Sequence, residues 1–215
     1  MPSLDFFWDL LFPPKCPFCG RLLERDGDLL CAACQRELPW LTGAEREKAV
    51  DFTSGCVAPL RYQGRVPGAV HAYKFGGKSA RSRTFGALVA QCVSDRGGDA
   101  DLVSWPPLSR KRLRQRGYDQ ARLLAEAVGK ALDLPVEATM VKREVPAQSS
   151  LSDEAARRAN VLGAYTVSDP ERIRDKRVLL VDDVVTSGAS LSECARVLRT
   201  AGALQVSCAA LARAR

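Results

Sequence analysis

From residue 56 onward, the chain alternates between two patterns of apolar positions. Short continuous apolar runs are typical of buried strands, whereas apolar residues three and four positions apart are typical of helices. Their alternation predicts an α/β fold in which a parallel sheet is joined and flanked by crossover helices. The predicted strands are 56–62, 102–105, 139–141, 177–181 and 206–211, and the predicted helices are 66–75, 83–94, 118–132 and 190–201.

The segments between these elements divide the chain further. Residues 41–55 are polar with glycine near both ends, which is typical of a connector, so we predict an N-terminal part at 1–55 and a main domain at 56–215. Residues 142–159 have little strand character. We expect there either a mobile loop or a loop that contains a helix at 152–158.

Four of the eight cysteines lie close together before the connector, as the pairs Cys16/Cys19 and Cys31/Cys34. Two Cys-x-x-Cys turns can hold one Zn²⁺ with four thiolates at about 2.3 Å, which leaves no coordination position for a substrate. We therefore predict a structural zinc ribbon with its core at 13–40, the alternative being free or redox-active thiols. The other cysteines are predicted to be small buried core residues: Cys56, Cys92, Cys194 and Cys208.

The predicted strand 177–181 ends in two carboxylates, Asp182 and Asp183, and a turn rich in hydroxyl residues follows at 186–190. Ligands of parallel sheets bind beyond the carboxyl ends of the strands. Amides and hydroxyls at the start of a helix can hold a phosphate, and carboxylates suit ribose hydroxyls or Mg²⁺. The loop therefore predicts a site for a phosphorylated sugar. A capped helix with two solvated aspartates is the plainer alternative, and it leaves the two successive acids unexplained.

This loop closely resembles the phosphoribosyl pyrophosphate (PRPP) motif of type I phosphoribosyltransferases, in which a hydrophobic run and two acids precede Thr-Thr-Gly-x-Thr. Here Ser187 and Ser190 replace threonines and keep the hydroxyls. The chain is also similar to the ComF family of competence-associated proteins, related to a gluconate-utilisation protein, in which a Cys-x-x-Cys ribbon precedes a phosphoribosyltransferase domain. The matching segments are Lys74-Phe-Gly-Gly, Arg112…Arg116-Gly-Tyr-Asp-Gln120, Gln148-Ser-Ser-Leu151 and Arg157-Arg-Ala-Asn160.

The resemblance implies PRPP bound together with Mg²⁺, and a reaction of the pentosyltransferase type that displaces pyrophosphate from the anomeric carbon. It implies that Asp182, Asp183, Arg116 and Lys142 assist catalysis and that residues 144–160 form a hood, in which either Arg157 or Arg158 fills the family's arginine position. The residues implied to contact PRPP are Asp182, Asp183, Val184, Thr186, Ser187, Gly188, Ala189, Ser190 and Arg143.

The formal net charge of +7 is unevenly distributed, because residues 60–144 hold 16 Lys and Arg against eight Asp and Glu. This excess suggests an anionic ligand or a nucleic acid, although a solvated basic surface explains the charge equally well. The single histidine, His71, excludes an HExxH zinc site. No apolar run reaches the roughly 18–20 residues of a membrane span, and residues 4–12 do not resemble a signal peptide, so we expect a cytoplasmic location.

Two hypotheses of different classes follow. The chain is either a PRPP-dependent transferase, or a non-catalytic accessory protein of DNA uptake that keeps the PRPP loop as a sensor or relic. In the second case its partner would be single-stranded DNA or a DNA-uptake helicase. Diphosphate needs a few convergent cations, whereas single-stranded DNA needs a longer basic track with stacking aromatics.

Overall fold

The computed structural model describes residues 14–24, 27–77, 79–143 and 161–214. Within them, the main sheet has six strands in the order β1-β2-β8-β7-β4, and β3 also pairs with β8. All its pairings are parallel except that of β1 with β2 at one edge. The strands of the main sheet are β1 (Glu47–Lys48), β2 (Cys56–Val57), β3 (Leu60–Arg61), β4 (Leu102–Ser104), β7 (Arg177–Val185) and β8 (Gln205–Arg213).

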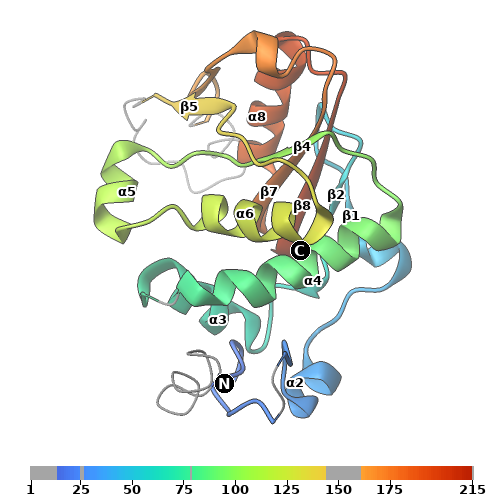
Figure 1. Cartoon of the computed structure of the whole chain (residues 1–215), viewed down its shortest axis with the longest axis vertical. Coiled ribbons are helices and arrows are strands. Elements are labelled where there is room, and N and C mark those ends of the chain that lie inside the picture. The colour runs from blue at the N-terminus through green and yellow to red at the C-terminus, as the bar shows by residue number, and fades with distance from the viewer. Residues whose placement is uncertain (1–13, 25–26, 78, 144–160, 215) are drawn as a thin grey trace, which may run out of the picture.

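A second, two-stranded antiparallel sheet pairs β5 (Met140–Lys142) with β6 (Tyr165–Val167). Figure 1 shows the helices in layers, with α3, α4 and α6 between the N-terminal part and the main sheet, and α8 at the opposite end. The helices are α2 (Ala32–Glu37), α3 (Val66–Phe75), α4 (Ser82–Arg96), α5 (Arg110–Arg116), α6 (Gln120–Leu132) and α8 (Ala189–Thr200), with 3₁₀ turns at Gly43–Arg46, Ser79–Arg81 and Pro170–Arg172.

The central strand β7 divides the core into two clusters. Successive residues of a strand point to opposite faces of the sheet. Leu179 and Val181 join the cluster that includes α3, α4 and α6, whereas Val178 and Leu180 join the cluster that includes α8. Because both faces are covered, β7 is apolar from Val178 to Val181, as is typical of a parallel sheet with helices on both faces.

The predicted elements are found in place, with several differences in their extent. The strand predicted at 56–62 is divided into β2 and β3, with Pro59 between them, which cannot donate a hydrogen bond to a neighbouring strand. The strand predicted at 139–141 belongs to the small second sheet, and its partner β6 was not predicted. Strand β7 continues to Val185, so the two acids lie inside the strand and not after it.

Helix α5 is a further difference, because no helix was predicted at residues 110–116. Ser109 caps the helix by accepting a hydrogen bond from the backbone N–H of Arg112, and Gly117 ends it in the left-handed conformation. The four cysteines predicted for the core are all buried, in agreement with the sequence. The boundary at residue 55 stays a prediction, and the segment 144–160 and the N-terminal stretch 4–12 lie outside the described residues.

Helices α4 and α6 approach each other closely at Gly86. A Cβ atom built on Gly86 would overlap the Cβ of Ala127 and lie 3.0 Å from its carbonyl carbon. Helix backbones can come this close only where a residue has no side chain. The absence of a side chain at position 86 therefore sets the spacing between the two helices.

We expect Gly86→Ala to lower the free energy of unfolding by about 1–3 kcal/mol, because the added methyl forces the two helices apart. Gly68→Ala in α3 is the matched control, since a Cβ there meets nothing within 4 Å and its φ is not positive. The control should raise stability by about 0.5–1 kcal/mol. Urea unfolding measures both changes, and equal effects at the two glycines would contradict the close approach.

Candidate functional site

Asp182 and Asp183 lie near the carboxyl end of β7 and have different surroundings. The side chain of Asp183 is buried, with 3% of the residue exposed, and its Oδ1 lies 2.7 Å from Nζ of Lys74 at the end of α3. The other oxygen, Oδ2, is buried without a hydrogen-bond partner among the described residues. The backbone N–H of Asp183 donates to Oδ1 of Asp182 at 2.8 Å. The pair is therefore held by one strand and one lysine from a distant helix.

Asp182 is partly exposed as a residue, whereas its carboxyl group is largely removed from solvent. Burial of its carboxyl, reinforced by the charge of Asp183, raises the pKa of Asp182 to about 7, while Lys74 opposes the shift. Two adjacent carboxylates repel each other. A cation or a hydroxyl donor placed beside them stabilises their ionised forms. The pair thus has the electrostatics of a site that binds hydroxyl groups or a divalent cation.

The turn after β7 leads into the first residues of α8. Gly188 precedes the helix with φ +80°, and a Cβ atom on it would lie 3.1 Å from a methyl of Val50, so both backbone and space favour glycine. The backbone N–H of Ala189 donates to Oγ of Ser187 at 3.4 Å. Free amides at the start of a helix favour an anion, and Thr186 and Ser190 add hydroxyls to the same turn. The geometry fits the predicted phosphate cradle.

Lys142 is the last residue of β5, and it contacts Tyr165 of β6 close to this turn. Its Nζ donates to the phenol oxygen of Tyr165 at 3.0 Å and lies 4.8 Å from the centre of that ring. Burial raises the pKa of Tyr165, and Ser190 at the start of α8 opposes this rise, so the phenol lies near both the lysine and the first turn of α8. Burial, followed by the charge of Arg112, lowers the pKa of Lys142. A partly desolvated cation next to the cradle is suited to a second phosphate group.

The two remaining candidate cations are placed differently. The guanidinium of Arg116 stacks on Phe75, with its central carbon 4.9 Å from the centre of the ring. Phe75 directly follows Lys74 in the sequence. Arg143 contributes its backbone N–H to the carbonyl of Ala164 at 2.8 Å, and its side chain is exposed. The structure therefore pairs Lys142 with Tyr165 near the start of α8, places Arg116 beside the Lys74 segment, and leaves Arg143 at the surface.

Sequence reasoning missed two residues of this site. The sequence indicated Lys74 only as part of a motif. A buried acid needs a nearby cation, and this requirement of Asp183 is the signal that could have pointed to the lysine. Tyr165 carried no signal, because its strand follows the segment 144–160 and has only three residues. Arg112, which the sequence indicated only as part of a motif, acts electrostatically on both Lys142 and Tyr165.

The four ribbon cysteines form a second site. Their sulfur atoms all lie within 4.8 Å of one another, and Sγ of Cys19 and Sγ of Cys31 are 3.5 Å apart. Thiolates around one tetrahedral Zn²⁺ would be separated by roughly 3.8 Å, given Zn–S bonds of about 2.3 Å. Gly20 has φ +77° directly after the first pair, and its N–H donates to the carbonyl of Cys16 at 2.9 Å. The residues present fit a structural zinc.

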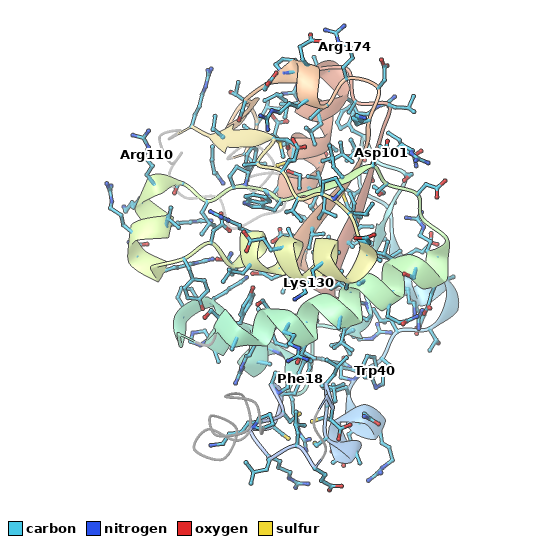
Figure 2. All side chains as sticks on the ribbon, in the orientation of Figure 1. Phe18, Trp40, Asp101, Arg110, Lys130 and Arg174 are labelled. Atoms are coloured by element: carbon cyan, nitrogen blue, oxygen red, sulfur yellow. The ribbon has the colours of Figure 1, made fainter. Side chains whose placement is uncertain are left out.

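The ribbon and the main domain share one core cluster. Phe18, between the first two cysteines, packs on Phe85 of α4 with ring centres 5.4 Å apart, and Figure 2 shows it where the ribbon meets the helices. Nη1 of Arg65, which precedes α3, lies 3.5 Å from Sγ of Cys34. A positive group beside a thiolate stabilises it. The ribbon is thus packed on α3 and α4 by apolar contact and by charge.

Two family profiles match separate parts of the chain. The double zinc ribbon domain matches residues 7–45, which include the four cysteines. The phosphoribosyl transferase domain matches residues 119–215, which include β5, β6, β7, α8 and β8. Both agree with the fold predicted from the sequence. In the described part of the chain, no helix is both long and apolar enough to cross a membrane.

We expect Cys34→Ser to lose bound zinc and to unfold the ribbon, since removal of one ligand opens the tetrahedron and binding of a structural zinc contributes directly to folding. Cys208→Ser is the control, because that buried thiol lies in β8 and outside the metal cluster. Metal analysis of the purified proteins should give about one zinc per chain for wild type and Cys208→Ser, and much less for Cys34→Ser. Equal zinc in all three would exclude this site.

Curated relatives match over most of the chain. Competence protein F of Haemophilus influenzae is 26% identical, over 93% of this chain and 97% of that protein. Competence protein ComFC of Streptococcus pneumoniae is 28% identical, over 92% of this chain and 87% of that protein. DNA utilization protein YhgH of Salmonella typhimurium is 30% identical, over 89% of this chain and 80% of that protein. The chain therefore belongs to the family of competence protein F, ComFC and YhgH, with a phosphoribosyl transferase domain and a double zinc ribbon.

Proposed function

We propose that this chain binds PRPP together with Mg²⁺ at the carboxyl end of β7 and acts there as a phosphoribosyltransferase. The observation that supports this most strongly is the buried, lysine-paired acid on β7, followed within a few residues by the glycine turn into α8. Neither element alone would identify a ligand. Together they support a ribose 5-phosphate as ligand, because carboxylates that would accept hydrogen bonds from ribose hydroxyls are followed within one turn by amides that would donate to a phosphate.

Each part of PRPP has a counterpart among these residues. The 5-phosphate would accept hydrogen bonds from the amides and hydroxyls of the turn Thr186–Ser190. The ribose hydroxyls would donate to Asp182, and to Asp183 where its unpartnered Oδ2 becomes accessible. The diphosphate would lie near Lys142 and Arg112, whose charges meet beside Tyr165. Asp182 and Asp183 would also help to hold the Mg²⁺ that accompanies PRPP, and that ion would neutralise part of the diphosphate charge.

In the transfer itself, the bond from C1 of the ribose to the diphosphate oxygen breaks, and pyrophosphate leaves with the electron pair. A nucleophilic atom of the acceptor forms the new bond to C1, and its proton passes to the departing pyrophosphate or to water. Lys142 and Arg112 stabilise the charge that develops on the leaving oxygen, and the fixed position of the two acids orients the ring.

A cytoplasmic location is part of the proposal. The thiols of all eight cysteines are free of disulfides in the structure, which fits the reducing compartment expected for Cys-x-x-Cys metal ligands.

We expect wild-type protein to bind Mg²⁺–PRPP in calorimetric titration, and Asp182→Asn/Asp183→Asn to weaken binding at least about tenfold, because each amide loses a charged acceptor. Asp99→Asn is the control, since that exposed carboxylate pairs with Arg177 at the other end of β7. Absence of binding by wild type would overturn the proposal. Where binding is seen, release of pyrophosphate with candidate acceptors separates an enzyme from a sensor.

A second candidate function, binding of single-stranded DNA, is supported by α5. Five of its seven residues are basic, and Arg110 through Arg114 are all exposed. Figure 2 shows Arg110 pointing away from the molecule. Leu113 is exposed on the same short helix, and the Phe75–Arg116 stack adds an aromatic surface next to it. The names of the relatives, which refer to competence and DNA utilization, agree with such a partner.

The DNA candidate predicts that the triple variant Arg110→Gln/Lys111→Gln/Arg114→Gln weakens binding of an oligonucleotide and flattens its salt dependence. Each lost phosphate contact lowers the slope of log K against log salt by about 0.7. These positions avoid Arg112 and Arg116, which adjoin the PRPP residues. Arg172→Gln/Arg174→Gln is the control at a distant basic surface. An unchanged slope in the triple variant would exclude α5 as the DNA surface.

A further inference from the structure

Helix α3 runs from the zinc ligands to the acidic pair. At its start, Arg65 lies 3.5 Å from the sulfur of Cys34 and 3.0 Å from the carboxylate of Glu37 in the ribbon helix α2. At its end, Lys74 lies 2.7 Å from Asp183. One short helix therefore carries a contact to the second cysteine pair at one end and a contact to the candidate PRPP site at the other.

A second connection joins the first cysteine pair to the same end of α3. Phe18, between Cys16 and Cys19, packs on Phe85, and Phe85 packs edge-on against Tyr73, with ring centres 5.4 Å apart at both contacts. Tyr73 directly precedes Lys74. Phe85 and Tyr73 are both fully buried, so this is a packed row of rings and not a surface contact.

Hydrogen bonds to the segment around the start of α6 also hold the end of α3. The hydroxyl of Tyr73 donates to the carbonyl of Gln120 at 2.7 Å, and the hydroxyl of Tyr118 donates to the carbonyl of Tyr73. The helix itself is anchored in the core through Val66, Ala69 and Val70. Lys74 therefore reaches Asp183 from a backbone whose position is set by the ribbon on one side and by the start of α6 on the other.

We propose that α3 couples the metal-loaded ribbon to the acidic pair, with Lys74 as the positioning residue for Asp183. The proposal rests on the proposed function for its ligand. Loss of metal releases the contacts of Phe18 and Arg65, which loosens α3 and with it the lysine that fixes Asp183. Coupling of this kind is reciprocal, so PRPP and zinc each raise the affinity of the protein for the other by the same factor.

The first experiment measures that reciprocity on the full chain. Zinc affinity is determined by competition with a chromophoric chelator, in excess Mg²⁺, with and without saturating PRPP. We expect PRPP to raise zinc affinity by at least about fivefold, within the usual range of coupling between sites. Asp182→Asn/Asp183→Asn serves as control, and PRPP should leave its zinc affinity unchanged. Equal zinc affinity with and without PRPP, in a wild type that binds PRPP, would overturn the coupling.

The second experiment tests Lys74 itself. Lys74→Met should weaken Mg²⁺–PRPP binding about tenfold and leave binding of inorganic pyrophosphate unchanged, because Lys74 acts on the ribose side and Lys142 on the diphosphate side. Lys74→Arg should restore part of the loss. Equal weakening of both ligands would indicate a general structural defect and reject the positioning role. Lys130→Met, at an exposed lysine of α6, is the matched control.

A third comparison needs no PRPP and therefore separates failure of the coupling from failure of the proposed function. Zinc affinity is measured for Lys74→Met and Phe85→Leu against wild type. Both should bind zinc about threefold or more weakly, whereas Ile173→Val, a buried change in the other core cluster, should not. If Lys74→Met binds zinc as wild type does, the coupling is wrong whether or not PRPP binds. If wild type fails to bind PRPP while these shifts are seen, the proposed function falls and the coupling stands.

Discussion

The ion pair between Asp183 and Lys74 is the interaction on which the rest of the site depends. A carboxylate with 3% of its residue exposed needs a nearby cation, and loss of the partner of a buried charge costs about 3–5 kcal/mol. The parallel sheet places the acid near the carboxyl end of its central strand. Helix α3 supplies the lysine, and the ribbon and α6 hold α3 in place. The sheet, the helix layer and the ribbon thus all contribute to one charge pair.

Much of this could be predicted from the sequence because the main signals are local. The apolar run before Asp182, the glycine of the turn and the helical spacing in α8 all lie within 25 residues, and the structure confirms the strand and the helix there. The four cysteines are equally local, since two tight turns suffice to bring the thiols together. Where backbone geometry and ligand chemistry come from one stretch of chain, sequence spacing is enough to predict the arrangement.

The contacts that sequence did not predict are all long-range. Lys74 is separated from Asp183 by more than half of the main domain, and nothing in its motif indicates which acid it meets. Tyr165 lies on a three-residue strand whose pairing with β5 depends on chain closure across residues 144–160. Helix α5 was missed for a different reason, because its residues have no apolar period and its start depends on one cap at Ser109. In each case tertiary packing supplies what local pattern lacks.

The basic residues in the segment 60–144 fall into two groups, one partly buried and one exposed. This difference bears on the choice between the two functions. Lys74 and Lys142 are partly buried, and each has a specific partner, Asp183 or Tyr165. Such cations are desolvated, so they favour a small anion in a fixed position over a mobile phosphate backbone. Arg110, Lys111 and Arg114 of α5 are exposed on one short helix and have the opposite character, typical of diffuse electrostatic attraction. The two proposed functions would use these two groups of cations in different ways, so a PRPP site and a nucleic-acid surface are compatible in one protein.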